Sequence, residues 1–335
     1  MNALTAKIKR KENLTSSEVE TVMRAIMSGK ASAEEIKDFL LALNAKGPTV
    51  DEITGAAKIL RQFSIPIRTK HKVVLDTCGT GGDQKDSFNI STVTALVVAG
   101  CGVVVAKHGN RSVSSKCGSA CVLEALGVNL QAEEGRLREC LDEIGIAFLF
   151  AQKLHPAMKN VAPVRKELGV KTIFNLLGPL LNPAKATHQM MGVYSRDLVE
   201  PMARVLQKLG LRRGLVVHGS DGLDEITTTG KTFVGEFNGR EVLSYDIDPV
   251  ELGLNVAAER DLKGDGVETN VRIVRAILDG EKGPKRDIVV LNAAYALYVA
   301  EKVKNISDGI SMAEKAIDSG KALEKLEALK RLTNR

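Results

Sequence analysis

The sequence of 335 residues has no tryptophan and few other aromatic residues, with four tyrosines and eight phenylalanines. Proteins that bind single-stranded nucleic acid stack the bases on aromatic side chains, so this composition argues against that function. A folded core must come mainly from Ala, Val, Leu and Ile. The hydrophobic content of 44% is ordinary for a globular protein of one large or two moderate domains.

Long hydrophobic runs are also missing. No stretch of about 18 uncharged apolar residues occurs, so the sequence predicts no transmembrane helix and no membrane partner. The N-terminus leads into charged residues rather than into the apolar segment of a signal peptide. The five cysteines lack the paired spacing of zinc ligands. We therefore expect a cytoplasmic protein with reduced cysteines.

Basic residues outnumber acidic ones, which gives a formal net charge of +6. This balance suits a nucleic acid, but it also suits a small polyanionic substrate. The charge is spread along the chain. Its densest cluster is interpreted as a solvated N-terminal segment and consists of Lys7, Lys9, Arg10 and Lys11.

The first 65 residues show the pattern of three short helices and no strand. Gly29 and Gly47 follow the first two helical patterns as stop signals. Three capping-box patterns precede apolar residues at helical spacing, namely Ser17 with Glu20, Ser32 with Glu35, and Thr49 with Glu52. We expect a small helical module that buries one face of each helix.

From about residue 72 the pattern changes to short apolar runs separated by helical segments. This alternation predicts a mostly parallel sheet flanked by helices, hence an α/β fold. The predicted strands are 73–75, 103–106, 147–150, 190–194, 215–217 and 288–291. Residues 157–181 form a helical insertion that we expect to rejoin the N-terminal module. Residues 228–237 predict an antiparallel excursion, and 321–335 a charged amphipathic helix.

The most informative segment is the turn after the first predicted strand, where Gly79, Gly81 and Gly82 stand within four positions. Glycines let backbone N–H groups approach an anion, and the start of the next helix adds free N–H groups and a positive dipole end. The turn lacks the fingerprints of a dinucleotide site and of a P-loop. It predicts a phosphate cradle, the alternative being a tight turn without a ligand.

Two further polar segments follow predicted strands. The segment Lys107 to Ser115 combines two cations, an amide and hydroxyls, which suit a polyphosphate. Asp224 and Glu225 suit Mg²⁺, a metal that is usually shared with substrate phosphates, and the Ser91 hydroxyl can complete its coordination. The carboxyl ends of parallel strands meet at one edge of a sheet, so we expect these segments to converge. Arg165 suits a substrate carboxylate, although a surface arginine explains it equally well.

Taken together, these motifs closely resemble those of the anthranilate phosphoribosyltransferase family, in order and in spacing. The resemblance covers the chain from about residue 10 onward and includes a similar Leu291-Asn292-Ala293-Ala294 stretch. The motifs are Gly79-Thr80-Gly81-Gly82-Asp83, Asn89-Ile90-Ser91-Thr92, Lys107-His108-Gly109-Asn110-Arg111, Ala162-Pro163-Val164-Arg165 and Asp224-Glu225.

The resemblance implies a fold of the nucleoside phosphorylase/phosphoribosyltransferase type. A helical domain (1–68, joined by helices from about 157–186) would carry a homodimer interface. An α/β domain (69–156 and 187–335) would hold the active site. The implied reaction transfers the phosphoribosyl group of 5-phosphoribosyl 1-pyrophosphate (PRPP) to the amine of anthranilate, releasing pyrophosphate, in tryptophan biosynthesis.

The resemblance also implies residue roles. The residues expected to bind PRPP are Gly79, Gly82, Asp83, Ser87, Asn89, Ile90, Ser91, Thr92, Lys107, His108, Gly109, Asn110, Arg111, Ser112, Val113, Ser114, Ser115 and Ser119. Those expected to bind anthranilate are Gly79, Asn110 and Arg165. Two Mg²⁺ ions per site would be held by Ser91, Asp224 and Glu225. An aromatic amine is a free nucleophile near neutral pH, so we expect no covalent nucleophile and no strong general base.

Two cysteines depart from the family pattern. Cys117 stands where the family often has Ser, and Cys121 where it usually has Asp. An aspartate at 121 would cap the following helix better than cysteine does. Two other functions remain as alternatives. One is a pyrimidine nucleoside phosphorylase, and the other is a nucleic-acid-binding protein of the same fold.

Overall fold

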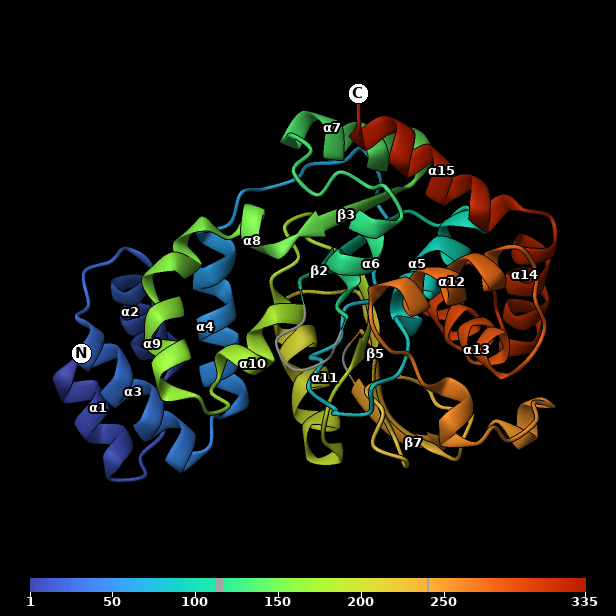
Figure 1. Cartoon of the computed structure of the whole chain (residues 1–335). Helices are drawn as coiled ribbons and strands as arrows, with labels where there is room; N and C mark the ends of the chain where they lie inside the picture. Colours follow the sequence, from blue (N-terminus) through green and yellow to red (C-terminus); the bar gives the residue numbers. More distant parts are fainter. Residues whose placement is uncertain (112–116, 240) are drawn as a thin grey trace.

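The computed structural model describes residues 1–111, 117–239 and 241–335. It has a smaller helical lobe beside a larger α/β lobe (Figure 1). The helical lobe begins with α1 (Asn2–Lys9), α2 (Ser16–Met27), α3 (Ala33–Lys46) and α4 (Val50–Gln62). The sequence predicts three of these helices and misses α1.

The starts of these helices are set by their capping residues. Ser32 with Glu35 and Thr49 with Glu52 form the predicted capping boxes at α3 and α4. At α2 the prediction of Ser17 with Glu20 is wrong, because the box is formed by Thr15 and Glu18, two residues closer to the N-terminus. The basic N-terminal cluster lies on and just after α1. Two of its lysines form ion pairs, Lys7 with Glu18 at 2.9 Å and Lys9 with Asp38 at 2.7 Å.

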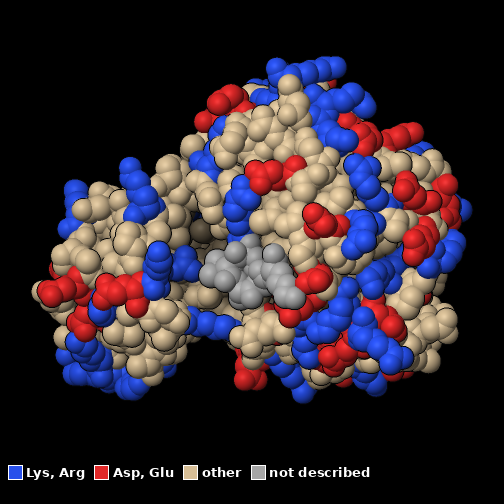
Figure 2. Space-filling view, in the orientation of Figure 1, with Lys and Arg blue, Asp and Glu red and all other residues tan. Residues whose placement is uncertain are grey.

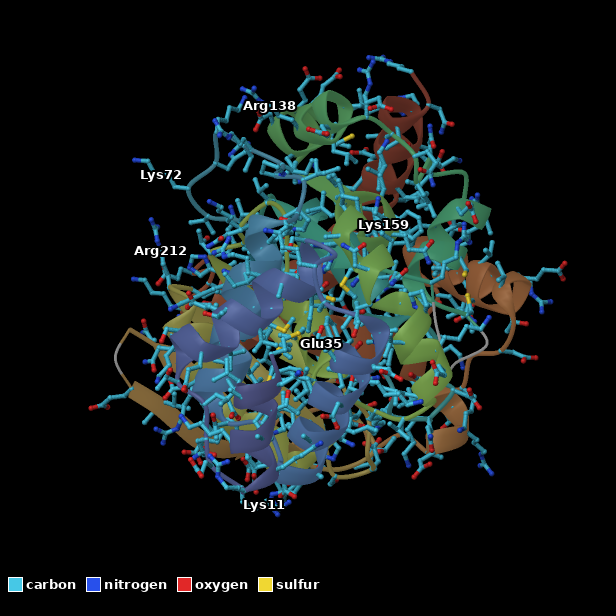
Figure 3. The ribbon with its side chains drawn as sticks, turned by 90° about the vertical axis from the view of Figure 1, so that its left-hand side faces the viewer. Lys11, Glu35, Lys72, Arg138, Lys159 and Arg212 are labelled. Atoms are coloured by element: carbon cyan, nitrogen blue, oxygen red, sulfur yellow. The ribbon has the colours of Figure 1, made fainter. Side chains whose placement is uncertain are left out.

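The helical insertion packs on this lobe, as the sequence predicts. Buried Val161, Val164 and Leu177 belong to the same hydrophobic cluster as the inner faces of α2, α3 and α4. Seen from the side, these helices lie in front of the sheet, with Glu35 of α3 and Lys159 of the insertion on the same side (Figure 3). In the structure the insertion begins earlier than predicted, at residue 151, and comprises α8 (Ala151–Leu154), η2 (Pro156–Asn160), α9 (Ala162–Leu168), α10 (Phe174–Leu177) and η3 (Gly178–Leu180).

The α/β lobe is built on one seven-stranded sheet in the order β3-β2-β1-β4-β5-β6-β7. The strands from β3 to β5 in this order are parallel to their neighbours. Strand β6 pairs antiparallel with both β5 and β7. The strands are β1 (Leu75–Asp76), β2 (Val105–Gly109), β3 (Ile146–Phe150), β4 (His188–Gly192), β5 (Arg213–Gly219), β6 (Thr232–Asn238) and β7 (Glu241–Ile247). The predicted antiparallel excursion corresponds to β6, and β7 is an edge strand that the sequence analysis misses.

One predicted strand is wrong. Residues 288–291 lie inside α13 (Pro284–Val299), the central helix of the C-terminal region. This helix is buried on almost every side, so its sequence lacks the polar face that would reveal a helical period. A short, continuous apolar run is therefore equally compatible with a buried strand.

Helices cover both faces of the sheet (Figure 1). In β4 and β5, Met190 and Leu215 face one hydrophobic cluster, whereas Met191 and Val216 face the cluster shared with the helical lobe. No helix of the described residues is long and apolar enough to span a membrane. The remaining helices are α5 (Ile90–Gly100), α6 (Ser119–Ala125), α7 (Glu134–Glu139), the π-helical η1 (Cys140–Ile144), η4 (Arg196–Leu198), α11 (Val199–Lys208), η5 (Val250–Leu252), η6 (Glu259–Leu262), α12 (Val267–Leu278), α14 (Ile306–Asp318) and α15 (Lys321–Thr333).

Candidate functional site

The glycine turn after β1 packs directly on the loop that follows β5. A Cβ atom on Gly79 would lie 3.0 Å from Asp224 Oδ2 and 3.0 Å from the carbonyl oxygen of Gly192. A Cβ atom on Gly192 would lie 1.5 Å from the carbonyl oxygen of Asp224. A larger residue at 192 would collide with the Asp224 backbone, so glycine is required there, whereas at 79 a Cβ atom would make tight contacts.

The acidic pair meets the glycine turn and the start of α5, as the sequence predicts. The backbone N–H of Gly81 donates to Asp224 Oδ2 at 2.8 Å, and that of Ser91 donates to Glu225 Oε1 at 3.2 Å. The buried Lys107 ammonium lies 3.1 Å from Ser91 Oγ. Side chains that lie on or after three different strands therefore converge at one edge of the sheet.

This acidic pair is held in an environment that disfavours its negative charge. Burial, together with the nearby Asp83, raises the pKa of Asp224 to about 7. Burial and the adjacent Asp224 also raise the pKa of Glu225 well above its ordinary value. Carboxylates crowded together in this way are stabilised as anions by a cation bound between them.

Several polar atoms around the turn are buried without a hydrogen-bond partner in the described part of the chain. They include Asp83 Oδ2, Asn89 Oδ1 and Thr92 Oγ1. Buried polar groups are almost always satisfied in folded proteins, so unpaired oxygens beside a glycine turn indicate a ligand or ion site. Of the other predicted residues here, Ile90 is part of the core, and Ser87 forms an isolated bridge with Lys263.

A buried carboxylate that the sequence analysis misses supports this edge of the sheet. Asp76, at the end of β1, accepts hydrogen bonds from Asn182 Nδ2 at 2.7 Å and from the backbone N–H of His108 at 3.1 Å. Burial raises the pKa of Asp76 to about 6. Its position just before the glycine turn is the only sequence feature that could have pointed to Asp76. A single acid at the end of a buried strand does not reveal which residues it contacts.

The His108 side chain is engaged with the helical insertion. Its Nε2 atom lies 3.1 Å from His155 Nε2, and its Nδ1 atom lies 3.1 Å from the carbonyl oxygen of Gly178. Burial lowers the pKa of His108 to about 3 and that of His155 to about 4. The pair is therefore neutral and links β2 to the insertion.

The loop after β2 contains residues expected to bind PRPP. Its Arg111 guanidinium makes two 2.8 Å hydrogen bonds to the Glu124 carboxylate, so in this structure it is directed at α6. Ser119, at the start of α6, donates from its hydroxyl to the carbonyl oxygen of Asn110 at 3.3 Å. Gly109 lies against this hydroxyl, since a Cβ atom there would be 2.5 Å from Ser119 Oγ. The expected contacts of Ser112, Val113, Ser114 and Ser115 lie outside the described residues.

Arg165 is a half-buried cation of the helical insertion. Its guanidinium lies over the Phe174 ring, 5.3 Å from the ring centroid, and burial lowers its pKa. No carboxylate of residues 1–111, 117–239 or 241–335 lies within ion-pair distance of it. An arginine held in this way is suited to a planar acid placed beside it.

Figure 2 shows a hollow between the helical lobe and the α/β lobe, and Lys and Arg side chains of both lobes border it. The positive border suits an anionic substrate that enters between the lobes.

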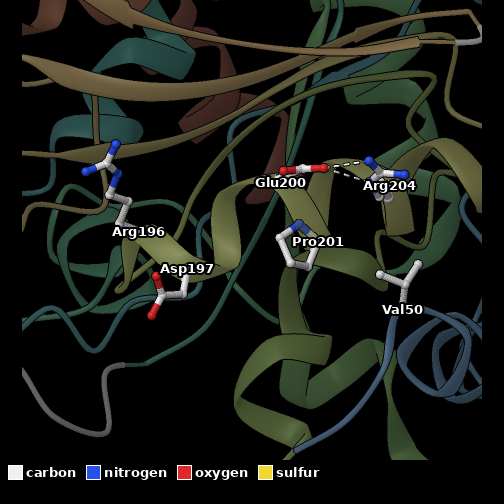
Figure 4. A pocket seen from close by; sticks show the side chains of 6 residues that line it. All are labelled: Val50, Arg196, Asp197, Glu200, Pro201 and Arg204. Atoms are coloured by element: carbon white, nitrogen blue, oxygen red, sulfur yellow. Dashed lines mark hydrogen bonds and ion pairs between the residues drawn. The ribbon is translucent and has the colours of Figure 1, made fainter.

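A second cavity, of about 460 Å³, lies away from the glycine turn. It is formed between the start of α4 and the segment η4–α11 (Figure 4). Its Arg204 pairs with Glu200, and its Arg196 covers the Phe233 ring at 3.7 Å. These arginines are already engaged, so this cavity is a weaker candidate for an anionic ligand than the glycine turn.

Comparison with known proteins agrees with this geometry. Residues 71–323 match the α/β domain of a glycosyl transferase family, and residues 2–64 match the helical bundle domain of a glycosyl transferase family. The anthranilate phosphoribosyltransferase of Acetivibrio thermocellus is 51% identical over 329 residues, covering 98% of this chain and 95% of that protein. The chain belongs to the anthranilate phosphoribosyltransferase family.

Solved structures of the family have the same fold. The Thermus thermophilus enzyme superposes with a TM-score of 0.94 at 44% identity, covering 99% of both chains. The Saccharomyces cerevisiae enzyme, solved in complex with PRPP and Mg, gives a TM-score of 0.90 at 27% identity and covers 100% of this chain and 99% of that one. The likeness extends over both lobes, as the family resemblance implies.

Proposed function

We propose that the protein transfers the phosphoribosyl group of PRPP to the amine of anthranilate and releases pyrophosphate, a step of tryptophan biosynthesis. The contact of Asp224 and Glu225 with the glycine turn and with Ser91 is the observation that carries this proposal. It joins a cation site to a phosphate cradle. The yeast relative, solved with PRPP and Mg, supports the assignment.

PRPP is proposed to lie along the glycine turn and the start of α5. Gly79, Gly82 and Asp83 would face the pyrophosphate and the ribose, while Asn89, Ser91 and Thr92 would bind phosphate oxygens. The unpaired buried oxygens of Asp83 and Asn89 support this placement. The segment from Lys107 to Ser115, which begins within β2, would close over the phosphoribosyl group together with Ser119.

The residues present fit Mg²⁺. Asp224, Glu225 and the Ser91 hydroxyl offer the oxygen ligands that this ion prefers. Within the described ranges, no group of three or more His, Cys, Asp or Glu side chains is arranged to hold a metal alone. Phosphate oxygens and water would therefore complete the coordination, and we propose two ions per site. When bound, Mg²⁺ would neutralise the charge that develops on the leaving pyrophosphate.

Anthranilate is proposed to bind between the lobes. The Arg165 guanidinium would pair with its carboxylate, and Gly79 and Asn110 would border its ring and amine. The lack of a carboxylate partner for Arg165 in the described chain supports this role, since burial alone shifts its pKa. The helical insertion would thus supply the part of the site that binds anthranilate, and the α/β lobe the part that binds PRPP.

Catalysis in this proposal depends on positioning and on stabilising the leaving group. The Lys107 ammonium and the positive end of the α5 dipole would stabilise the negative charge that develops on the leaving group. The amine of anthranilate needs no strong base near neutral pH. The chain's contribution is therefore to hold the amine next to C1 of the ribose while water is excluded.

The proposal includes a division of the chain into a helical domain of residues 1–68, joined by about 157–186, and an α/β domain formed by 69–156 and 187–335. It also includes a homodimer formed through the helical domain and a cytoplasmic location. Sedimentation of the purified protein tests the dimer, and a monomer at micromolar concentration would contradict it.

Anthranilate fluorescence provides the test of function. We expect the signal to fall on mixing the protein with PRPP, and to fall only when Mg²⁺ is present. An unchanged signal with a folded protein would contradict the proposal. Phosphorolysis of a pyrimidine nucleoside, or salt-sensitive DNA binding without turnover, would then favour the alternative functions.

A further inference from the structure

Lys171 extends from the helical insertion to the α/β lobe. It follows α9 after Gly169, whose φ of +61° ends the helix and turns the chain back. Its ammonium nitrogen lies 3.6 Å from the centroid of the Tyr194 ring, and Tyr194 follows β4. The cation–π contact therefore joins two parts of the chain that border the proposed site.

The Tyr194 backbone is tied to the glycine turn. Its N–H donates to Thr80 Oγ1 at 3.2 Å, and the N–H of Thr80 donates to the carbonyl oxygen of Gly192 at 2.9 Å. As a result, Lys171 lies at the turn itself. Its ammonium nitrogen would be 4.0 Å from a Cβ atom on Gly82, which has a φ of +78°. A charged group at this distance can reach a ligand that contacts the Gly82 backbone.

The charge of Lys171 is not neutralised by a neighbouring acid in the described chain. Other lysines that bridge segments distant in sequence have carboxylate partners, such as Lys37 with Glu167 at 2.5 Å and Lys208 with Asp51 at 2.5 Å. Lys171 instead rests on an aromatic face, which holds an ammonium weakly and leaves its N–H groups available to an anion.

We propose that Lys171 is a substrate-binding residue that contacts the diphosphate of PRPP from the helical side of the site. This rests on the proposed function, and it adds a cation from the insertion to a phosphate site otherwise built from the α/β lobe. The ammonium moves from the Tyr194 ring to a phosphate oxygen, which adds a contact between the diphosphate and the helical insertion. Arg165 of the same insertion binds anthranilate in the proposed function, so one segment contacts both substrates.

Titration calorimetry with inorganic pyrophosphate and Mg²⁺ tests the contact without requiring turnover. We expect Lys171→Gln to weaken pyrophosphate binding about tenfold, and Lys171→Arg to weaken it less than about threefold, since arginine keeps the charge. The matched control is Lys166→Gln, an exposed lysine in the last turn of α9. It changes the net charge equally, so we expect it to leave binding near the wild-type value.

Steady-state kinetics gives a second readout. Lys171→Gln is expected to raise the KM for PRPP by a similar factor and to leave the KM for anthranilate unchanged. Wild-type pyrophosphate affinity in Lys171→Gln would overturn the inference, and so would a change in the KM for anthranilate alone. Equal weakening in Lys166→Gln would also overturn it, because long-range charge would then explain the effect. If the wild-type protein is inactive and binds no pyrophosphate, the proposed function fails as well.

Discussion

Glu225 is the residue whose charge matters most for the proposed chemistry. Glu225→Gln keeps an oxygen that can accept from the Ser91 N–H but removes the negative charge. We expect kcat to fall by about 100-fold or more at saturating Mg²⁺. The melting temperature should stay the same or rise, because a buried carboxylate is replaced by a neutral amide.

The control for this variant is Glu251→Gln, an exposed acid in η5. It is expected to retain wild-type turnover. A Glu225→Gln enzyme with near-normal kcat would show that the carboxylate is not a metal ligand.

Arg165 is expected to contribute most to the affinity for anthranilate. Arg165→Ala removes the cation over Phe174 and should raise the KM for anthranilate about 10- to 100-fold, while the KM for PRPP changes little. Arg165→Lys should recover only part of this loss, since an ammonium cannot make the two parallel hydrogen bonds of a guanidinium. Initial rates with each substrate varied in turn check this result, and equal effects on both KM values would contradict it.

At the scale of elements, Glu52 connects three parts of the helical lobe. Its buried carboxylate accepts from the backbone N–H groups of Leu14 and Thr49 and pairs with Lys46 at 2.9 Å. Glu52→Ala removes the charge partner of the Lys46 ammonium, which keeps Asn13 Oδ1 and the Gly47 carbonyl oxygen as acceptors, and it leaves the two backbone N–H groups without theirs. We expect a loss of about 3 kcal/mol in the free energy of unfolding. Urea denaturation measures it, and the exposed Glu34→Ala should change stability far less.

Helix α6 offers a second prediction. Cys121 is its third residue, and its Sγ atom lies 3.9 Å from Arg111 Nη1, next to the Arg111–Glu124 pair. The N-cap is Gly118, so an aspartate at 121 would act through Arg111 and the helix dipole rather than as a cap. We expect Cys121→Asp to be neutral or stabilising by up to about 1 kcal/mol. Scanning calorimetry tests this against Cys121→Asn, which should give no gain.

At the scale of the whole molecule, the His108–His155 pair makes stability depend on pH. Burial holds the pKa of these imidazoles at about 3 and about 4, whereas a histidine in the unfolded chain titrates near 6.5. Below that pH the unfolded chain binds protons that the folded chain does not. The free energy of unfolding therefore falls as the pH drops from about 7 toward 4.

The size of this effect follows from the two pKa values. By pH 5 the loss is of order 2 kcal/mol per imidazole. Urea unfolding at pH 8, 6.5 and 5 measures it, and His155→Gln should reduce the decline relative to the wild type. Equal declines in both proteins would show that other groups cause the acid sensitivity.

The sequence by itself determined the fold class, the family and the grouping of the motifs. Helix caps, glycine turns and polar segments after apolar runs are local patterns, and each carries its physical reason within a few residues. Ser32 and Thr49 begin their helices because a side-chain oxygen satisfies a free N–H three positions on. The convergence of Asp224 with the glycine turn was predictable because parallel strands end at one edge.

Only the tertiary structure decided features in which the partners come from distant segments. The strand predicted at 288–291 is a helix because burial on all sides removes the periodic signal. Asp76 with Asn182, His108 with His155, and Lys171 with Tyr194 are pairs that no local pattern reveals. In each pair, packing brings one partner from the helical insertion or the segment directly after it against a partner in the α/β lobe. Which side chains meet there depends on how the two lobes pack, and that is fixed by the core as a whole.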